Sequence, residues 1–340
     1  MTAAFATKNP VLEALHAEMA RQMADSRASL AQNAAQARAI AETITRNGRL
    51  VLLGMGGSHA VGRTLTPCYR ALGIDAVTLP LSEQLDQPLP LAGRTVLVTS
   101  QSGESAEVLR WFAEGHAPAD AFGLTMQAES SLARLAPCLV GAGGSEIPFA
   151  ATRSLTVTLA LHAAVLAALG ADLAAVEAVI AADPQPEISA ALAKMAGVRT
   201  IVTSGRAQQG VAEALALGLT ELSRLPCFSL EGGQLRHGPV EMLAPEVGVV
   251  MFRDAGPSAT YVTSLAEFVL RTSASPLVIF DASGLAPVEG ACTVPCPPGT
   301  GLAASFALLP AAQHFMVDFA ASRVPDVGTP LRSSKVTKVE

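Results

Sequence analysis

The chain has 340 residues, which is long enough for about two domains that each bury a hydrophobic core. Half of the residues are hydrophobic but only 4% are aromatic, a composition typical of alanine-rich helices packed closely on a sheet, so we expect an α/β fold rather than a β-sandwich. The net charge of −6 and the scattered basic residues argue against nucleic-acid binding and favour a small-molecule partner.

The cysteines and the apolar stretches indicate where the protein works. Five cysteines, an odd number, stand in a long chain with no recognisable signal peptide, so we expect free thiols in a reducing cytoplasm. The longest apolar region, residues 155–182, is interrupted by His162, Gly170, Asp172 and Glu177. Charged residues are costly in a membrane and ordinary in core helices joined by a turn, so we expect no membrane span.

A leading helical segment and a first α/β unit are expected in the N-terminal half of the chain. We place the helical segment at residues 1–47, because residues 10–46 carry helical periodicity with mixed charges. The first unit is placed at residues 48–183. Its short apolar runs alternate with helical stretches and lie at residues 50–53, 76–79, 96–98 and 122–124. This alternation predicts a parallel, doubly wound sheet flanked by helices.

A break at residues 183–186, Asp-Pro-Gln-Pro, precedes a second unit that we place at residues 198–322. Its start, residues 199–206, repeats the pattern of residues 49–56, a short strand that ends in glycine before an alanine-rich helix. This repetition favours two copies of one α/β unit. Further strands are expected at residues 247–252, 276–280 and 293–295, and helices at residues 211–225 and 302–322. The polar residues 323–340 predict an extended C-terminal arm.

A hydroxyl-rich turn follows the apolar run 96–98 and precedes a helix. It contains three serines and an amide, Ser100, Gln101, Ser102 and Ser105. The free N–H groups and the dipole of a helix N-terminus favour an anion, so this turn is a candidate phosphate site that uses hydrogen bonds rather than cations. An ordinary turn in which Ser102 only caps the helix is the alternative for this segment taken alone.

A glycine-rich loop, residues 54–59, follows the first expected strand. It fails the dinucleotide-binding fingerprint because His59 stands at the third glycine, and it fails the P-loop pattern because Arg63 stands at the lysine position. The simpler expectation is that the loop brings Ser58 and its N–H group beside Ser100, because the carboxyl ends of neighbouring parallel strands form a common crevice.

Three titratable residues are candidates for proton transfer or carbonyl chemistry. Glu221 lies on the expected helix 211–225, and His237 lies between a glycine-rich segment and a Gly-Pro turn, where an imidazole can exchange protons near neutral pH. Only four of the 23 basic residues are lysines, so Lys335 is a mild indication of amine chemistry such as a Schiff base. The alternatives are a solvated helix carboxylate, a histidine with a satisfied hydrogen bond and a lysine in a solvated tail.

Taken together, these residues resemble the sugar isomerase (SIS) domain family, in particular the tandem pair of SIS domains in glucosamine-6-phosphate synthase and in the related deaminases. The resemblance covers nearly the whole chain. Residues 100–105 are similar to the sugar-phosphate loop of that family, residues 56–58 to its partner loop, and residues 146–156 to the segment that closes over the sugar. His237, sixteen residues after Glu221, matches the ring-opening histidine, and Lys335, five residues from the end, matches the sugar-binding lysine.

The resemblance implies two tandem SIS domains, each a parallel doubly wound sheet flanked by helices, and it assigns roles to the site residues. The implied catalytic residues are Glu221, His237 and Lys335, with His237 donated by the neighbouring subunit of a homodimer. The implied phosphate-binding residues are Ser58, Ser100, Gln101, Ser102 and Ser105. Further contacts to the sugar are implied for Gly57, Phe149, Ala150 and Ser334. No metal ion or organic cofactor is implied.

The function that the resemblance implies is a cytoplasmic deaminase that converts glucosamine 6-phosphate to fructose 6-phosphate and ammonia. Residue 2 is threonine and not the cysteine that glutamine-dependent transfer needs, so the synthase reaction is not expected. An aldose–ketose phosphosugar isomerase and a deglycase for phosphorylated sugar–amine adducts would use the same phosphate site. Outside the enzymes, the alternative is a regulatory module that senses a sugar phosphate, for which the three catalytic candidates would be superfluous.

Overall fold

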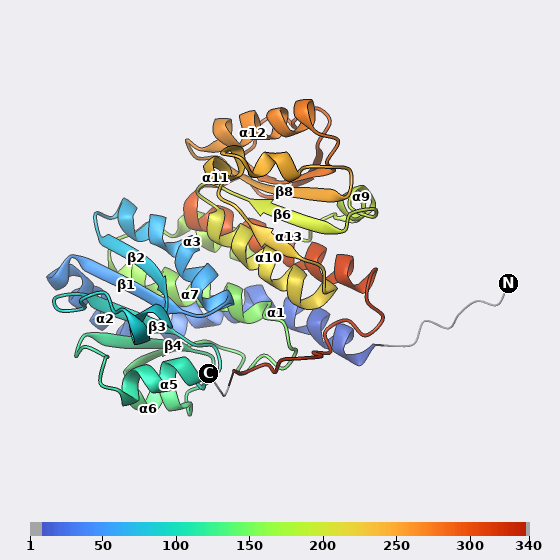
Figure 1. Cartoon of the computed structure of the whole chain (residues 1–340). Helices are drawn as coiled ribbons and strands as arrows, with labels where there is room; N and C mark the ends of the chain where they lie inside the picture. The colour runs from blue at the N-terminus through green and yellow to red at the C-terminus, as the bar shows by residue number, and fades with distance from the viewer. Residues whose placement is uncertain (1–8, 338–340) are drawn as a thin grey trace.

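The structure is a computed structural model that describes residues 9–337, so the outer ends of the expected helical segment and of the C-terminal arm, residues 1–8 and 338–340, lie outside the described residues. Figure 1 shows two helix-flanked sheets, the first below and the second above, with long helices between them. The chain opens with α1 (Pro10–Gln32) and α2 (Ala34–Asn47). Helix α1 begins at Pro10 because the side chain of Asn9 accepts hydrogen bonds from the N–H groups of Val11 and Leu12.

The first sheet is entirely parallel and has five strands in the order β2-β1-β3-β4-β5. The strands are β1 (Arg49–Gly54), β2 (Asp75–Pro80), β3 (Thr95–Thr99), β4 (Ala121–Thr125) and β5 (Cys138–Val140). The helices of this unit are α3 (Gly57–Ala71), α4 (Glu83–Asp86), α5 (Ala106–Ala113), α6 (Ser131–Leu135), α7 (Arg153–Ala168) and α8 (Ala174–Ala182). The predicted parallel sheet is confirmed, and the short edge strand β5 is an addition to the prediction.

Both faces of this sheet are buried, which explains why its strands read as continuous apolar runs. Leu50 and Leu52 of β1 belong to the apolar cluster that includes residues of α1 and α7. Val51 and Leu53 belong to a separate cluster with Trp111 of α5. Because successive side chains of a strand point to opposite faces, the leucine and valine side chains of β1 are buried against one helical layer or the other, and only Arg49 at its start is exposed.

The second sheet is also entirely parallel and has the order β10-β9-β8-β6-β7. Its strands are β6 (Thr200–Ser204), β7 (Cys227–Ser229), β8 (Val247–Asp254), β9 (Leu277–Ala282) and β10 (Cys292–Pro295). The helices are α9 (Ser189–Lys194), α10 (Gln209–Ser223), α11 (Gly232–Arg236), the 3-10 turn η1 (Pro239–Met242), α12 (Ala259–Thr272) and α13 (Gly301–Ala321). Counted from β7, this strand order repeats that of the first sheet, so the expectation of two copies of one α/β unit is confirmed.

The two sheets share one continuous apolar core. The largest cluster contains Leu97 of the first sheet, Phe280 of the second, and Phe306 and Phe315 of α13. Within the described residues, α13 is the one helix long and apolar enough to cross a membrane, but 89% of its apolar window is buried inside the protein. It is therefore a core helix that joins the two halves.

The strand order of the first sheet positions the two loops that the sequence singles out. Strand β1 lies between β2 and β3, so the chain leaves the carboxyl ends of β1 and β3 in opposite directions along the sheet. Gly54, the last residue of β1, pairs directly with Thr99, the last residue of β3. Such a point, at which the strand order reverses, is the usual place for a ligand in a doubly wound sheet.

Candidate active site

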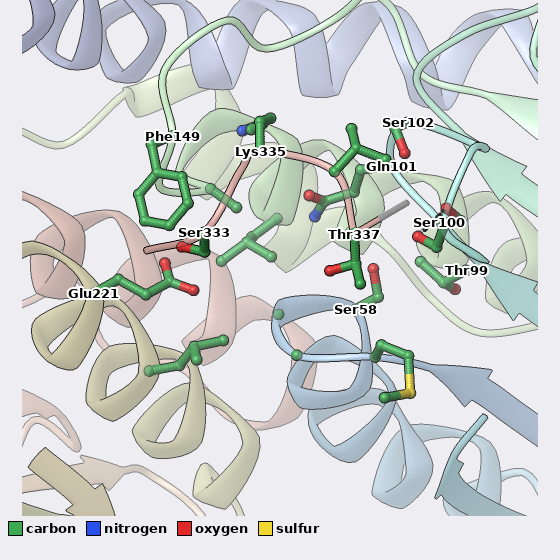
Figure 2. A pocket seen from close by; sticks show the side chains of 18 of the residues that line it. Ser58, Thr99, Ser100, Gln101, Ser102, Phe149, Glu221, Ser333, Lys335 and Thr337 are labelled. Carbon is green, nitrogen blue, oxygen red and sulfur yellow. Dashed lines mark hydrogen bonds between the residues drawn. The ribbon is translucent and has the colours of Figure 1, made fainter. Parts of the chain in front are cut away.

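A cavity of about 280 Å³ opens at this edge of the first sheet. Its size is near the lower end of ordinary small-molecule pockets, roughly 300–1,000 Å³. Figure 2 shows Ser100 and Ser102 of the hydroxyl-rich turn on one side, Glu221 on the opposite side, Ser58 below and Lys335 above. The cavity is therefore built by the loops after β1 and β3, by α10 and by the C-terminal arm.

The hydroxyl-rich turn is held in shape by its own hydrogen bonds. The hydroxyl of Ser100 accepts a hydrogen bond from the N–H of Gly103 at 3.2 Å and lies 3.1 Å from the hydroxyl of Ser105. Gly103 has φ +66°, and a Cβ atom there would overlap with Ser130. The turn thus requires glycine at this position and presents the side chains of Gln101 and Ser102 to the cavity.

The carboxylate of Glu104 lies in the same turn and would repel a phosphate if it faced the cavity. It points away instead, because its two oxygens accept hydrogen bonds from the N–H and the hydroxyl of Ser131, at 2.7 and 2.9 Å. These contacts lie at the start of α6, where a negative charge is favourable. The turn therefore offers the cavity hydroxyl, amide and N–H groups without an opposing charge.

Helix α5 begins at this turn with an unusual acceptor on its first N–H group. The N–H of Ala106 donates a hydrogen bond of 3.0 Å to the backbone carbonyl of Thr337, a residue of the C-terminal arm. The side chain of Ser105 makes no capping hydrogen bond of its own. The arm thus brings an oxygen atom to a helix N-terminus, where oxygen acceptors and anions bind well.

The glycine-rich loop forms the floor of the cavity. Gly56 has φ +51° and precedes α3, whose first residues are Gly57 and Ser58. A Cβ atom on Gly57 would come within 2.9 Å of a methyl group of Leu155, so the close approach of this loop to α7 favours glycine. Gly57 and Ser58 both line the cavity.

Glu221 is the most perturbed titratable group that lines the cavity. It lies near the end of α10, which stops at Ser223 because Arg224 adopts a left-handed conformation with φ +57°. Burial raises the pKa of Glu221 to about 7, and the positive charge of Lys335 opposes this shift. A carboxyl group with such a pKa can both take up and release a proton near neutral pH.

The C-terminal arm closes the cavity and carries Lys335. Arg224 anchors the arm by a bidentate ion pair with Asp326, both contacts at 2.9 Å, and by a 3.0 Å hydrogen bond to the carbonyl of Thr329. The arm then runs towards α5, as the dark red segment in Figure 1 shows, and its residues 333–337 line the cavity. The Nζ atom of Lys335 lies 3.5 Å from a carboxylate oxygen of Glu146.

The structure brings most, but not all, of the predicted site residues to one cavity. Those that line it are Gly57, Ser58, Ser100, Gln101, Ser102, Ser105, Phe149, Glu221, Ser334 and Lys335. Ala150 is fully buried and does not line it, whereas its neighbour Ala151 does. His237 is exposed at the end of α11 in the second unit and does not line the cavity of its own chain.

Several lining residues were not among the sequence predictions. Thr99, Leu217 and Thr337 belong to segments that the sequence singled out, but nothing in their residue types separates them from structural positions. Within residues 9–337, no group of three or more histidine, cysteine, aspartate or glutamate side chains is arranged to hold a metal ion.

Solved structures of other proteins have the same arrangement of two parallel sheets around one core. The C-terminal domain of glucosamine-fructose-6-phosphate aminotransferase from Francisella tularensis matches with a TM-score of 0.80 at 17% identity, over 93% of this chain and 98% of that one. The tagatose-6-phosphate ketose/aldose isomerase from Escherichia coli also gives 0.80, at 21% identity, over 98% and 100%. The chain therefore has the phosphosugar isomerase (SIS) fold, and its two sheets are consistent with two SIS domains.

Two further comparisons concern particular proteins. A glucosamine-6-phosphate deaminase from Thermotoga maritima matches with a TM-score of 0.69 at 18% identity, over 92% of this chain and 99% of that one. A glutamine–fructose-6-phosphate aminotransferase from Rhizobium meliloti is 28% identical over an alignment of 191 residues that covers 50% of this chain and 32% of that protein. The chain thus matches about a third of the length of its curated relatives. No family model matches the chain.

Proposed function

We propose that this protein is an amino sugar phosphate deaminase that converts glucosamine 6-phosphate and water to fructose 6-phosphate and ammonia. The observation that carries the proposal is the position of Glu221, whose pKa is raised to about 7 by burial, across one cavity from the hydroxyl-rich turn. A phosphate held by the turn would leave the other end of a hexose chain on the side of Glu221. This end contains C1 and C2, between which an aldose and a ketose exchange a proton.

The carbon-to-carbon step of the proposed reaction needs one carboxylate that moves one proton from C2 to C1. In the open-chain amino sugar, Glu221 removes the proton from C2 while the aldehyde oxygen takes up a proton, which gives a 1,2-enaminol. Glu221 then returns its proton to C1 while the nitrogen loses one, which leaves an alcohol at C1 and an imine at C2. Water then adds to C2, the C2–N bond breaks, and ammonia leaves with the ketose phosphate as the other product. General acid–base catalysis of this kind contributes roughly 10²–10⁴-fold in rate.

The phosphate would be bound without a cation. Ser58, Ser100, Gln101, Ser102 and Ser105 supply hydroxyl and amide groups on one side of the cavity. The N–H of Ala106 is taken by the carbonyl of Thr337, so the first turn of α5 would contribute its remaining N–H groups and the positive end of its dipole. Since the carboxylate of Glu104 is turned towards Ser131, the site has no charge that opposes the phosphate within this turn.

The ring-opening step calls for a second copy of the chain. His237 is exposed and lies outside the cavity of its own chain, so in our proposal it enters the cavity of a partner subunit in a homodimer. Lys335 lines the cavity and would bind the open-chain carbonyl. The five cysteines are unpaired, which supports a reducing cytoplasm as the place of action.

A second candidate function is favoured by the likeness to the tagatose-6-phosphate ketose/aldose isomerase, which covers 98% of this chain. An aldose–ketose phosphosugar isomerase uses the same phosphate site and the same proton transfer, but its substrate carries a hydroxyl group at C2 and no ammonia is released. Ammonia release therefore separates the two candidates.

The test is to incubate the purified protein with glucosamine 6-phosphate and to measure ammonia and fructose 6-phosphate together. We expect equal amounts of both products from the wild type, and a loss of about 10²–10⁴-fold in kcat/KM for Glu221→Gln. Glu213→Gln is the matched control, because Glu213 lies on the same helix but does not line the cavity. If hexosamine phosphates give no products while a hexose phosphate is isomerised, the second candidate function replaces the first.

A further inference from the structure

We propose that Glu146 is a positioning residue that binds the ammonium group of Lys335 and thereby holds the C-terminal arm over the cavity before substrate binds. This inference rests on the proposed function, in which Lys335 acts on the substrate. It assigns a role to a carboxylate that does not itself line the main cavity.

The carboxylate of Glu146 is buried and hydrogen-bonded in a way that favours binding of a positive charge. The side chain is 1% exposed, and one of its oxygens accepts hydrogen bonds from the N–H and the hydroxyl of Thr152, at 2.9 and 2.7 Å. The other oxygen accepts a hydrogen bond from the hydroxyl of Ser154 and lies 3.5 Å from the Nζ of Lys335. Within residues 9–337, Lys335 is the one cation in ion-pair contact with Glu146.

A buried carboxylate is costly unless it is paired and hydrogen-bonded. Thr152 and Ser154 supply hydrogen bonds but no positive charge, so the ammonium of Lys335 completes the environment of Glu146. Arg153 follows Thr152 in the chain, but its guanidinium turns away and pairs with Glu18 and Asp25 of α1. The positive charge that Glu146 needs must therefore come from the arm.

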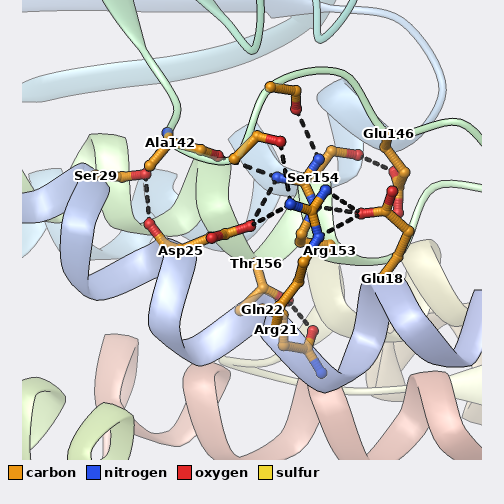
Figure 3. Close-up of polar contacts among 12 residues, drawn as sticks. Glu18, Arg21, Gln22, Asp25, Ser29, Ala142, Glu146, Arg153, Ser154 and Thr156 are labelled. Atoms are coloured by element: carbon orange, nitrogen blue, oxygen red, sulfur yellow. Dashed lines mark hydrogen bonds and ion pairs between the residues drawn. The ribbon is translucent and has the colours of Figure 1, made fainter.

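A buried network around Arg153 braces the segment that carries Glu146 (Figure 3). Arg153 is fully buried and donates hydrogen bonds to the carbonyls of Ala142 and Gly144, at 3.1 and 2.7 Å, as well as to Glu18. Burial raises the pKa of Glu18, but its hydrogen bonds from Arg153 and Arg21 outweigh burial and leave that pKa below its usual value. These contacts fix residues 142–146 against α1 and α7, so the carboxylate of Glu146 is held in place for its contact with the arm.

The ion pair sits where it can control the position of the arm. Arg224 holds the arm at Asp326 and Thr329, and the N–H of Ala106 holds it at Thr337. The Glu146 contact lies between these two anchors, beside a small cavity of about 60 Å³ that is next to the main one. With Lys335 placed in advance, less conformational entropy is lost when substrate binds, which lowers the cost of forming the reactive complex.

The first experiment measures closure of the arm without any substrate, so it does not depend on the proposed function. Arg332 is an exposed residue of the arm, and tryptic cleavage after it reports how often the arm opens. We expect Glu146→Gln and Lys335→Gln each to raise this cleavage rate about tenfold, as the loss of a charge-assisted contact would. Ser154→Ala is the control, because it removes one hydrogen bond and keeps the charge of Glu146, so its cleavage rate should stay near that of the wild type.

The second experiment is a double-mutant cycle on kcat/KM with glucosamine 6-phosphate. If Glu146 acts by positioning Lys335, Glu146→Gln lowers kcat/KM in the wild type and has no further effect in a Lys335→Gln background. A merely structural role of Glu146 would give the same loss in both backgrounds. The inference is overturned by additive losses, or by tryptic cleavage of Lys335→Gln that is as slow as in the wild type. If the wild type were inactive on amino sugar phosphates, the proposed function would fail. The tryptic cleavage experiment needs no substrate and would still decide the role of Glu146.

Discussion

At the scale of single residues, Glu221 combines burial with a functional position. Its raised pKa has a kinetic consequence, because a carboxyl group must be ionised to remove a proton from C2. We expect kcat/KM to fall about tenfold for each pH unit below about 7, and to level off above it. A pH profile of the wild type measures this fall of kcat/KM below pH 7, and the residual activity of Glu221→Gln should not show it. A flat profile between pH 5 and pH 8 would contradict the assignment.

The same pKa shift has a consequence for stability. The pKa of Glu221 is higher in the folded protein, about 7, than its usual value of 4.5, so the folded state binds the proton more tightly. The resulting stabilisation is complete below pH 4.5 and is lost as the pH rises through 7. At pH 8 the buried carboxylate therefore costs up to about 3 kcal/mol.

Glu221→Gln should remove this cost. We expect the variant to be more stable than the wild type at pH 8, with a difference that shrinks towards zero as the pH falls to 4.5. Urea unfolding at both pH values measures the two free energies of unfolding. A variant that is less stable than the wild type at pH 8 would show that Glu221 is held by favourable contacts rather than strained by burial.

At the scale of elements, the turn after β3 depends on Gly103. Alanine there must adopt φ +66° and must also displace Ser130, whose hydroxyl caps α6. Gly115 has a similar φ of +76° but no atom within 4 Å of an added Cβ. Gly103→Ala should therefore destabilise the protein by about 1–3 kcal/mol more than Gly115→Ala, and it alone should raise KM for the sugar phosphate.

Thermal melting and steady-state kinetics of the two variants provide the comparison. Both variants carry the backbone strain of a left-handed alanine, so the difference between them isolates the collision with Ser130. Equal values of KM for the two variants would mean that the conformation of this turn does not matter for substrate binding.

The main strands of the first sheet were predictable from sequence because their signals are local. Strands β1 and β3 are short apolar runs followed by turn residues, and the rule that parallel strands end at one edge places Ser58 beside Ser100. Strands β5 and β7 contain three residues each at the edges of their sheets, too few to show any periodicity. Their existence depends on pairing with a neighbouring strand rather than on their own residues.

The site was predictable only where one segment carries its own signal. The serines of the turn after β3 form such a signal, whereas Glu146 is one carboxylate in a polar segment. Its importance arises from Thr152, Ser154 and the distant Lys335, which meet only in the folded chain. The outward direction of Glu104 likewise depends on Ser131 of another element, so sequence alone could not settle it.

At the scale of the whole molecule, the proposal requires a cavity completed by a second chain. Glu221 lines the cavity and His237 of the same chain does not. In a homodimer with shared sites, a mixture of Glu221→Gln and His237→Ala subunits would contain heterodimers with one intact site. We expect about a quarter of wild-type activity from an equal mixture that has been unfolded and refolded together, although each variant alone is inactive. If a mixture proven to contain heterodimers recovers no activity, His237 does not act in the mechanism.

In the proposed reaction, Glu221 moves a proton between C1 and C2 of a bound amino sugar phosphate. The most direct measurement follows glucosamine 6-phosphate labelled with deuterium at C2 and analyses the products by mass spectrometry and NMR. We expect fructose 6-phosphate and ammonia in equal amounts from the wild type, with the deuterium moved to C1 or lost to water, and only trace amounts of either product from Glu221→Gln. Ammonia released at an unchanged rate by Glu221→Gln, or ammonia released together with an aldose phosphate that keeps its deuterium at C2, would contradict the proposed proton transfer.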